Sequence, residues 1–193
     1  MESIEEKVRL VQSGEIGHFR AIVETYQKQI YAYCCRLLDS EHEAEDALQE
    51  IMVKAYENID RYRPTFSFSS WLYKLAYHHC ITLLRRQKVR ARAYRLLRST
   101  EAEKSAEEIV SDRVFGEPLR SALLAVKPEE RNLLVLRVFE ERSFQEMADI
   151  LDMRTDTVKK RYERLRRKLG KLMKEREEGE ECGRRAKSWT IRN

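Results

Sequence analysis

The sequence predicts an all-α fold of two small helical domains joined by a flexible charged linker, with a helix–turn–helix in the second domain. Apolar residues recur at steps of three and four over most of the 193-residue chain, which is the spacing of one helix face. Only three prolines and six glycines interrupt this pattern, so the composition favours helices over sheets. We place the domains at 1–97 and 118–173, the linker at 98–117, and a polar tail at 174–193 that we expect to be disordered.

The first domain is predicted to hold three or four helices. The first begins within 8–13 and is interrupted by a glycine-containing segment. The second should span 18–38, and the third 41–59, each with a clear apolar stripe. A fourth helix begins near Ser70, and its pattern is lost in the basic run at 85–88.

The second domain is predicted from short helices at 119–126 and 129–140, followed by a helix, a tight turn and another helix over 143–172. Ser143 and Glu146 have the spacing of a capping box, and Thr155 is placed to cap the last helix. One side of that last helix is an apolar seam and the other is basic. Such a helix can dock in the DNA major groove, although a helical hairpin with a solvated basic face has the same pattern.

The charge distribution predicts more than one macromolecular partner. The net charge of +5 is uneven, with basic clusters at 85–98 and 159–174 and acidic ones at 41–50 and 101–117. This separation suggests an anionic partner on two surfaces and a different partner on a third.

Several classes of protein are disfavoured by the sequence. No stretch approaches the roughly 20 apolar residues of a membrane span, and the N-terminus does not resemble a signal peptide, so we expect a cytoplasmic protein without membrane insertion. The cysteines lack metal-ligand spacing; a zinc site from His78, His79 and Cys80 is the alternative, but consecutive helical residues point in different directions. We expect no metal, no cofactor and, because no catalytic motif is present, no enzyme.

The segment 62–88 interleaves aromatic and basic side chains, which is typical of single-stranded DNA binding. Unpaired bases stack on aromatic rings with roughly 1–3 kcal/mol per base, while cations follow the backbone. Trp71 and the phenylalanines could instead be core residues. Tyr73, Tyr77 and His78 fall off the predicted buried face, and we expect them to be exposed.

Three segments, in this order, carry a resemblance to a known family. They are AEDALQEIMVKAYENID (44–60), FSSWLYKLAYHHCITLLRRQK (68–88) and PEERNLLVLRVFEERSFQEMADILDMRTDTVKKRYERLRRKL (128–169). Together they resemble the sigma-70 family of bacterial transcription initiation factors, and specifically its small extracytoplasmic-function (ECF) group. The resemblance covers nearly the whole chain except the linker and the tail.

The resemblance implies a role for each segment. It places core-polymerase binding at Asp46, Gln49 and Glu50. Binding and melting of the minus-10 element are implied for Phe66, Phe68, Ser70, Trp71, Lys74, Tyr77, His78, Thr82, Arg85 and Arg86. Binding of the minus-35 element is implied for Thr157, Lys159, Lys160, Arg161, Glu163 and Arg164. The chain departs from the family pattern at His78 and Thr82, which leaves the minus-10 preference open, and at Lys127 and Asp156.

The resemblance also implies the function and the partners. An alternative sigma factor binds core RNA polymerase, through the coiled coil of the largest subunit and the flap, and promoter DNA in duplex and single-stranded form. An anti-sigma factor is a further expected partner, and the chain should be a monomer when free of partners. The acidic linker resembles the segment that relatives thread through the RNA-exit path. A stand-alone helix–turn–helix regulator and a helical adaptor without DNA contact are the alternatives.

Overall fold

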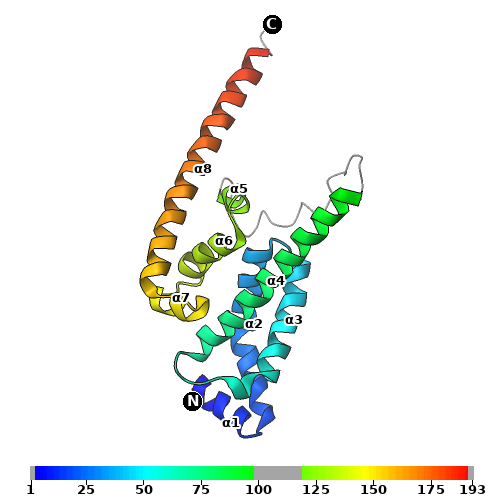
Figure 1. Cartoon of the computed structure of the whole chain (residues 1–193), viewed down its shortest axis with the longest axis vertical. Coiled ribbons are helices and arrows are strands. Elements are labelled where there is room, and N and C mark those ends of the chain that lie inside the picture. The colour runs from blue at the N-terminus through cyan, green and yellow to red at the C-terminus, as the bar shows by residue number, and fades with distance from the viewer. Residues whose placement is uncertain (1–2, 98–118, 191–193) are drawn as a thin grey trace.

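The computed structural model describes the backbone of residues 3–97 and 119–190, and the side chains of 3–94, 119 and 121–175. Every regular element in these ranges is helical (Figure 1), which confirms the predicted all-α class. The predicted linker at 98–117 lies outside the described residues.

The first domain is a helical bundle whose element ends are fixed by short-range polar signals. It consists of α1 (Ile4–Gln12), the 3-10 turn η1 (Ile16–His18), α2 (Phe19–Leu38), α3 (Glu41–Glu57), the turn η2 (Ile59–Arg61) and α4 (Phe68–Leu97). The Ser3 hydroxyl accepts from the Glu6 amide at 3.2 Å and the Glu6 carboxylate accepts from the Ser3 amide at 2.6 Å, so a capping box starts α1. The Ser40 hydroxyl caps α3 by accepting from the Glu43 amide.

The core of this domain lies between α2, α3 and α4. Its largest fully buried side chains include Ile22, Ile30, Tyr33, Leu37, Ile51, Phe68, Leu72 and Tyr73. The Gln12 side chain donates to the carbonyls of Ile59 at 2.8 Å and Tyr62 at 3.1 Å, and so fastens α1 to the loop that precedes α4. That loop therefore has a fixed base.

The second domain consists of α5 (Leu119–Leu124), α6 (Pro128–Leu134), the π-helical turn η4 (Val135–Phe139), α7 (Phe144–Leu151) and α8 (Thr155–Thr190). The predicted capping box of α7 is confirmed: the Ser143 hydroxyl accepts from the Glu146 amide at 3.1 Å, and the Glu146 carboxylate accepts from the Ser143 amide at 2.8 Å. Asp152, in the left-handed conformation with φ of 54°, ends α7.

Three local predictions are wrong. The predicted fourth helix does not end in the basic run but continues as α4 to Leu97, because Arg, Gln, Leu and Ala all favour helix. The segment 174–190, predicted to be a disordered tail, continues α8, and its many Glu, Lys and Arg residues likewise favour helix. Thr155 does not cap α8; it is the first helical residue, and its hydroxyl donates to the Gln145 side chain at 2.9 Å.

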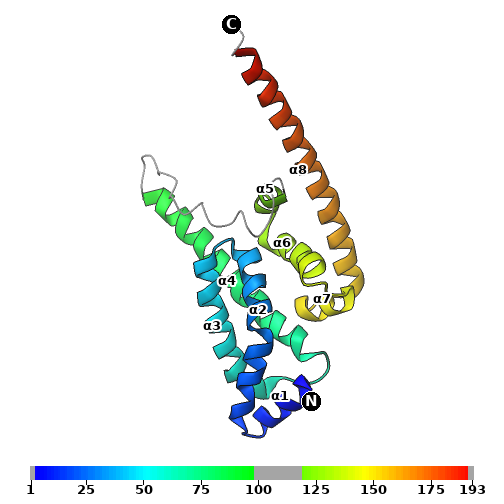
Figure 2. The same ribbon diagram turned by 180° about the vertical axis from the view of Figure 1, so that it is seen from behind.

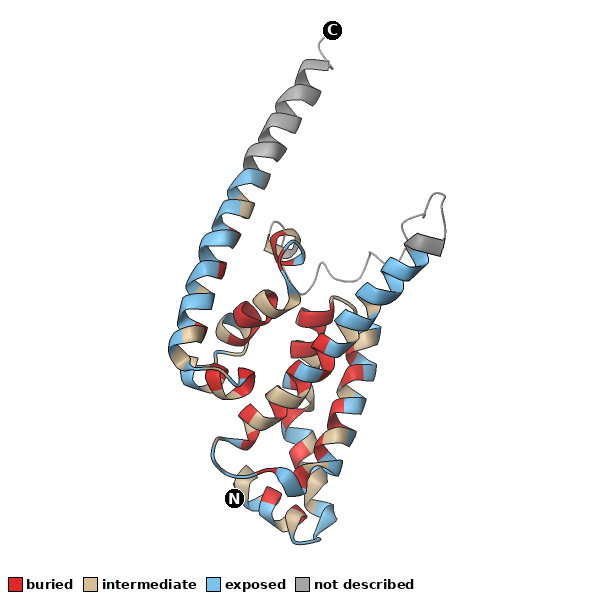
Figure 3. Cartoon of the chain, viewed as in Figure 1, coloured by how far each residue is buried: buried red, intermediate tan, exposed pale blue. Residues whose placement is uncertain are grey.

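The two domains pack against each other. Figures 1 and 2 both show α6 and α7 beside the first domain, where α7 contacts α4 and α6 contacts α2 and α4. Buried residues gather where helices face one another, whereas residues 88–94 of α4 and the outer face of α8 as far as residue 175 are exposed (Figure 3). The exposure of residues on α4 therefore depends on both domains.

Candidate nucleic-acid interface

An acidic and amide face on α3 points to solvent. Ala44, Ala47 and Ile51 bury the opposite side of the helix, so Asp46, Gln49 and Glu50 are exposed. Because these positions are three and four residues apart, they share one face. The structure thus brings the predicted polymerase-binding residues together on an accessible surface.

A buried histidine from α4 supports this face. Lys54 donates through Nζ to Nδ1 of His79 at 2.7 Å and to the Glu50 carboxylate at 3.2 Å. Burial of the imidazole and the adjacent Lys54 ammonium lower the pKa of His79, so the ring is neutral and accepts at Nδ1. Glu50 therefore lies beside the Lys54 ammonium, which is positioned by its hydrogen bond to His79.

The loop before α4 is tied down by its own side chains. The Tyr62 hydroxyl donates to the Phe66 carbonyl at 2.9 Å. The Ser67 hydroxyl accepts from the Ser70 amide at 3.2 Å and donates to the Ser70 hydroxyl at 3.1 Å. Phe66 is half-buried at the loop surface, whereas Ser70, a predicted DNA contact, is buried in this network. Ser70 therefore shapes the loop and does not present its side chain to a ligand.

An aromatic cluster underlies the loop. The Phe68 ring centroid is 5.4 Å from that of Tyr62, 5.3 Å from Trp71 and 5.9 Å from Tyr26. Phe68 is fully buried, so its prediction as a DNA contact is wrong: it lies one helical turn from Leu72 and joins the same core face. Trp71 is half-buried. Of the two, Trp71 is the ring that a base could reach.

The next turns of α4 are divided between solvent and the second domain. His78 is exposed, as predicted, but Tyr73 and Tyr77 are buried, and their predicted exposure is wrong. The Tyr73 ring packs against Tyr33 of the first domain's core, with the ring centroids 5.2 Å apart, and is also covered by Glu140 and Arg142 of the second domain. The apolar periodicity of one domain cannot predict a contact with the other domain.

The polar end of α4 offers exposed side chains. Thr82, Arg85 and Arg86 are all exposed, although the Thr82 hydroxyl donates to the His78 carbonyl of its own helix at 2.7 Å. Arg85 pairs with Glu129 of α6 at 3.2 Å. Lys74, one turn before His78, is half-buried and pairs with Asp152 at 3.5 Å. Two of the predicted DNA-binding cations of α4 are thus paired with carboxylates of the second domain.

On the basic face of α8, the predicted minus-35 residues have no ion pair among those found in the described part of the chain, whereas Lys168, further along the helix, pairs with Glu130 at 2.8 Å. Val158, Leu165 and Leu169 are buried against α5, α6 and α7, which fixes the opposite face outward. Lys159, Lys160, Arg161, Glu163 and Arg164 are exposed, and Thr157 is half-buried. The whole predicted minus-35 set lies on the first turns of this one helix.

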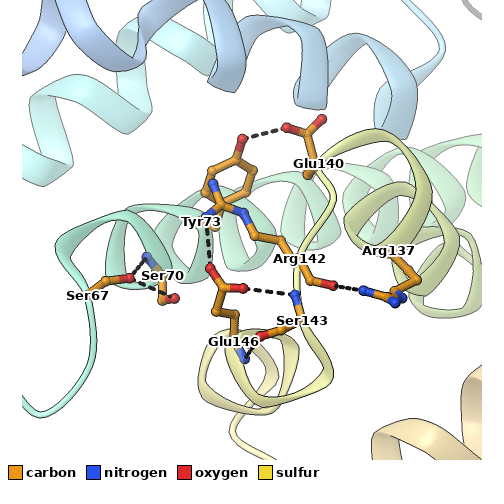
Figure 4. A network of polar contacts seen from close by, with 8 residues as sticks. All are labelled: Ser67, Ser70, Tyr73, Arg137, Glu140, Arg142, Ser143 and Glu146. Atoms are coloured by element: carbon orange, nitrogen blue, oxygen red, sulfur yellow. Dashed lines mark hydrogen bonds and ion pairs between the residues drawn. The ribbon is translucent and has the colours of Figure 1, made fainter.

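A polar network joins the two domains (Figure 4). The Glu140 carboxylate accepts from the Tyr73 hydroxyl at 2.5 Å, as Figure 4 shows. The same carboxylate pairs with Arg36 of α2 at 2.9 Å. The Arg142 guanidinium lies over the Tyr73 ring, 4.4 Å from its centroid, and pairs with Glu146 at 3.2 Å. Burial and the adjacent Glu140 carboxylate raise the pKa of Tyr73, which keeps the hydroxyl protonated as the donor.

A second set of buried bonds lies closer to the end of α2. The Tyr33 hydroxyl donates to the Asn132 side chain at 2.7 Å, and Nη1 of Arg131 donates to the Leu37 carbonyl at 3.0 Å. Arg131 and Asn132 are both buried. An arginine at a helix C-terminus also interacts favourably with the helix dipole.

These interdomain residues were not among those predicted from the sequence. The only local signal is the break in the apolar pattern after Phe139, where Glu140, Glu141 and Arg142 follow one another. That break predicts a turn, and it carries no information about which distant residues the side chains meet.

The zinc alternative is not supported by side-chain directions. Cys80 points into the core, with its Sγ 3.7 Å from that of Cys34, while His79 meets Lys54 and His78 faces solvent. In the described part of the chain, no group of three or more His, Cys, Asp and Glu side chains is placed to hold a metal ion.

Comparison with known proteins identifies the family. Residues 22–90 match Sigma-70 region 2, and residues 116–169 match Sigma-70, region 4. The chain is 31% identical to the ECF RNA polymerase sigma factor SigW of Bacillus subtilis (strain 168), over 89% of this chain and 97% of the relative. It is 32% identical to RNA polymerase sigma factor YlaC of the same organism, over 79% of this chain and 91% of the relative. The chain belongs to the sigma-70 family, in its ECF group, and is an alternative sigma factor for transcription initiation.

Solved structures share the fold. CnrH, determined in complex with the cytosolic domain of CnrY, has a TM-score of 0.64 at 22% identity and covers 87% of this chain and 95% of its own. RpoE of Bartonella quintana, determined with the anti-sigma factor NepR, has a TM-score of 0.63 at 18% identity and covers 81% of this chain and 96% of its own. Among the described helices, none combines the length and apolar character needed to cross a membrane.

Proposed function

We propose that this sigma factor binds core RNA polymerase through the exposed face of α3, the minus-10 element through α4 and its preceding loop, and the minus-35 element through α8. The observation that carries the proposal is the α8 surface, where an exposed row of cations follows a capped helix and a tight turn. This is the arrangement in which a recognition helix enters the major groove.

On α8, some exposed side chains are proposed to contact bases and others to contact phosphates. Lys160 and Arg164 lie four residues apart on one exposed face and can donate to guanine edges. Glu163 can accept from a cytosine amino group. Lys159 and Arg161 flank that row and supply phosphate contacts, which are independent of base sequence and sensitive to salt.

On α4, the proposed contacts are those that reach solvent. Phe66 and Trp71 offer aromatic edges for an unpaired base, which stacking would stabilise by roughly 1–3 kcal/mol. His78 and Thr82 are placed to read its neighbours, and Arg85 and Arg86 to hold phosphates. Phe68 and Ser70 support this surface from within and contact no DNA.

The α3 face suits a partner that carries arginines. Two carboxylates and an amide at one-turn spacing can accept several charge-assisted hydrogen bonds from a basic helix, such as the coiled coil of the polymerase largest subunit. An anti-sigma factor is a second proposed partner, supported by the fold neighbours, because CnrH and RpoE were each determined with a partner protein.

Reconstituted transcription tests the proposal. The full chain is mixed with core polymerase, and initiation is mapped on a promoter library. The expected result is co-purification with core and initiation at sites that share two elements. Duplex binding without core association would indicate a stand-alone regulator and would reject the sigma mechanism.

A paired variant tests the α3 assignment. Gln49→Lys with Glu50→Lys should weaken core binding by roughly 2–5 kcal/mol, because like charges would then face the partner's arginines. Duplex binding through α8 should not change. The matched control is Glu24→Lys with Gln29→Lys, the same charge change on exposed positions of α2, which should leave both activities intact. Equal loss of core and duplex binding in the double variant would indicate misfolding.

A further inference from the structure

The face of α3 that is proposed to bind polymerase is anchored to the interior of the helical bundle through one lysine. Lys54 lies one turn after Glu50, and its Nζ donates to the Glu50 carboxylate at 3.2 Å and to Nδ1 of His79 on α4 at 2.7 Å. The side chain of Glu50 is 61% exposed, whereas that of His79 is 6% exposed. The three side chains therefore connect a buried ring to a carboxylate that faces solvent.

The lysine and the glutamate would not hold each other firmly without the histidine. A glutamate four residues before a lysine is the favourable order on a helix. The pair is nevertheless largely exposed, and exposed ion pairs are weak because water screens them and both long side chains lose freedom. The bond to His79 gives the Lys54 ammonium a fixed acceptor on a neighbouring helix. An ammonium restrained in this way also restrains the carboxylate that is paired with it.

The imidazole of His79 contributes more than filling space in the core. Because Nδ1 accepts from Lys54, the proton of the neutral ring is on Nε2, and this atom is buried without a hydrogen-bond partner among the described residues. An unpaired buried donor is unfavourable, and an apolar side chain would occupy the same space without that cost. The bond to the Lys54 ammonium is therefore the favourable contribution that distinguishes an imidazole at this position.

Another polar contact joins the same two helices away from Glu50. The side chain of Gln87 on α4 donates to the carboxylate of Glu43 in the first turn of α3. Glu43 lies seven residues before Glu50, or about 10 Å along the helix. This contact helps to hold α3 against α4 and does not involve the Glu50 carboxylate. It therefore provides a control that separates general helix packing from the orientation of Glu50.

We propose that His79 is a positioning residue for polymerase binding: it holds the Lys54 ammonium, which in turn holds the Glu50 carboxylate ready to accept from a cationic side chain of the partner. The inference deepens the proposed role of the α3 face and rests on it. A carboxylate that is already ordered loses less freedom when the partner binds, so more of the interaction appears as affinity. The polymerase-binding surface thus depends on a residue that is itself buried.

The protonation state of His79 gives this link a signature in pH. The charged groups that act on the ring are Lys54 and Glu50 of α3 and Arg86 of α4. A protonated ring cannot accept from Lys54 and repels it, and its Nδ1, 3.8 Å from the Glu50 carboxylate, attracts Glu50 inward. Because burial and Lys54 lower the pKa of His79 below 6.5, the link is present at neutral pH and is lost as pH falls. Acidification should therefore weaken core binding through this ring.

Core-binding measurements on matched variants test the inference. The affinity of the fluorescently labelled full chain for core RNA polymerase is measured at pH 7.5. His79→Leu, which fills the space without an acceptor, should weaken binding by roughly fivefold or more, and Lys54→Met should do the same from the solvent side. His79→Asn, whose amide oxygen lies near the position of Nδ1, should stay within about twofold of the wild type. Unchanged affinity in both His79→Leu and Lys54→Met would overturn the inference.

The same measurement at pH 5.5 distinguishes positioning from a merely structural role. The wild type should lose roughly threefold more affinity between the two pH values than His79→Asn does, because only the imidazole titrates in this range. Gln87→Leu removes the Glu43 contact and should keep both the wild-type affinity and the wild-type pH dependence. Equal pH dependence in the wild type and His79→Asn would overturn the inference. So would a loss in Gln87→Leu as large as that in His79→Leu.

A double-mutant cycle with Glu50 separates this inference from the proposed function. Glu50→Ala should weaken core binding by roughly fivefold or more, and His79→Leu should add at most about twofold in that background, because both act through one carboxylate. A full further loss from His79→Leu would overturn the inference and leave the α3 assignment intact. Wild-type core affinity in Glu50→Ala would instead reject the α3 assignment, and the inference with it. Duplex binding through α8, measured for every variant, verifies that each is folded.

Discussion

Helices α8 and α4 are both proposed to contact DNA, yet among the described residues only α4 has aromatic residues covered by the other domain. Lys159, Lys160 and Arg161 face solvent, whereas Tyr73 and Tyr77 are buried between the domains. The difference is chemical. An aromatic ring packs as well against a protein domain as against a base, but a row of cations would need a paired anion for each charge before it could be buried. Aromatic residues are therefore more easily covered by another protein domain than a row of cations is.

The largest expected effect concerns the exposed member of this comparison. Lys160→Glu with Arg164→Glu should weaken holoenzyme binding to a selected promoter by roughly 2–6 kcal/mol, as the sum of two contacts of 1–3 kcal/mol each. Electrophoretic mobility shift measures the loss. The control is Arg20→Glu with Lys28→Glu, the same charge change on exposed positions of α2. A loss of equal size in the control would mean that net charge alone governs binding.

A single truncation distinguishes base contacts from phosphate contacts on α8. Arg164→Ala should cost roughly 1–3 kcal/mol, concentrated at one position of the upstream element, when binding is measured across a set of single-base promoter variants. Arg161→Ala should weaken all variants alike and reduce the slope of affinity against salt by about one. If Arg164→Ala also acts uniformly, Arg164 contacts phosphate.

The same helix-cap substitution can be made in each domain, so that its effects on stability and on duplex binding can be compared. Ser143→Ala and Ser3→Ala each delete the hydroxyl of a capping box and should each cost about 1 kcal/mol in urea unfolding. Only Ser143→Ala should also weaken duplex binding, because α7 supports α8. Equal effects on duplex binding would show that α8 is positioned by the whole molecule and not by its own domain.

The smallest expected effect is the pH dependence that His79 gives to the stability of the first domain. The pKa of His79 is lowered from its ordinary value of 6.5 by burial and by Lys54. The unfolded chain therefore binds a proton more readily, and stability is lost as pH falls through 6.5. For Glu146, burial acts to raise the pKa, but hydrogen bonds with Ser143 and Arg142 outweigh it and leave the pKa below 4.5, so its contribution is lost only in stronger acid.

Urea unfolding at pH 7.5 and 5.5 measures this dependence, and His79→Gln should reduce the difference between the two values. The exposed neighbour His78 provides the control, because His78→Gln should reduce it less. An unchanged difference in His79→Gln would remove this residue as the source.

Local signals in the sequence were enough for most of the fold. Helix spacing located the elements, and the Ser143 capping box and the outward direction of Lys160 and Arg164 are confirmed, because each depends on residues within two turns. The exposure of Asp46, Gln49 and Glu50 followed from the same periodicity.

The candidate site on α4 was less predictable because its environment is made by distant residues. Phe68 could be core or contact on spacing alone, and its position against Tyr26 and Tyr62 decides for the core. Tyr73 meets Glu140, which is 67 residues away in the chain. No residue pattern within α4 could predict that Tyr73 pairs with Glu140.

Within the described residues, three non-glycine residues adopt the left-handed conformation, and they differ as targets for stabilising substitutions. Glycine at such a position removes a cost of roughly 1–2 kcal/mol, offset in part by the greater freedom of the unfolded chain. Asp39 lies near the Arg131 charge, and Asp152 pairs with Lys74, so glycine at either would sacrifice an attraction. Glu141 is exposed, so Glu141→Gly is the substitution to combine first when a longer-lived, heat-tolerant variant is sought.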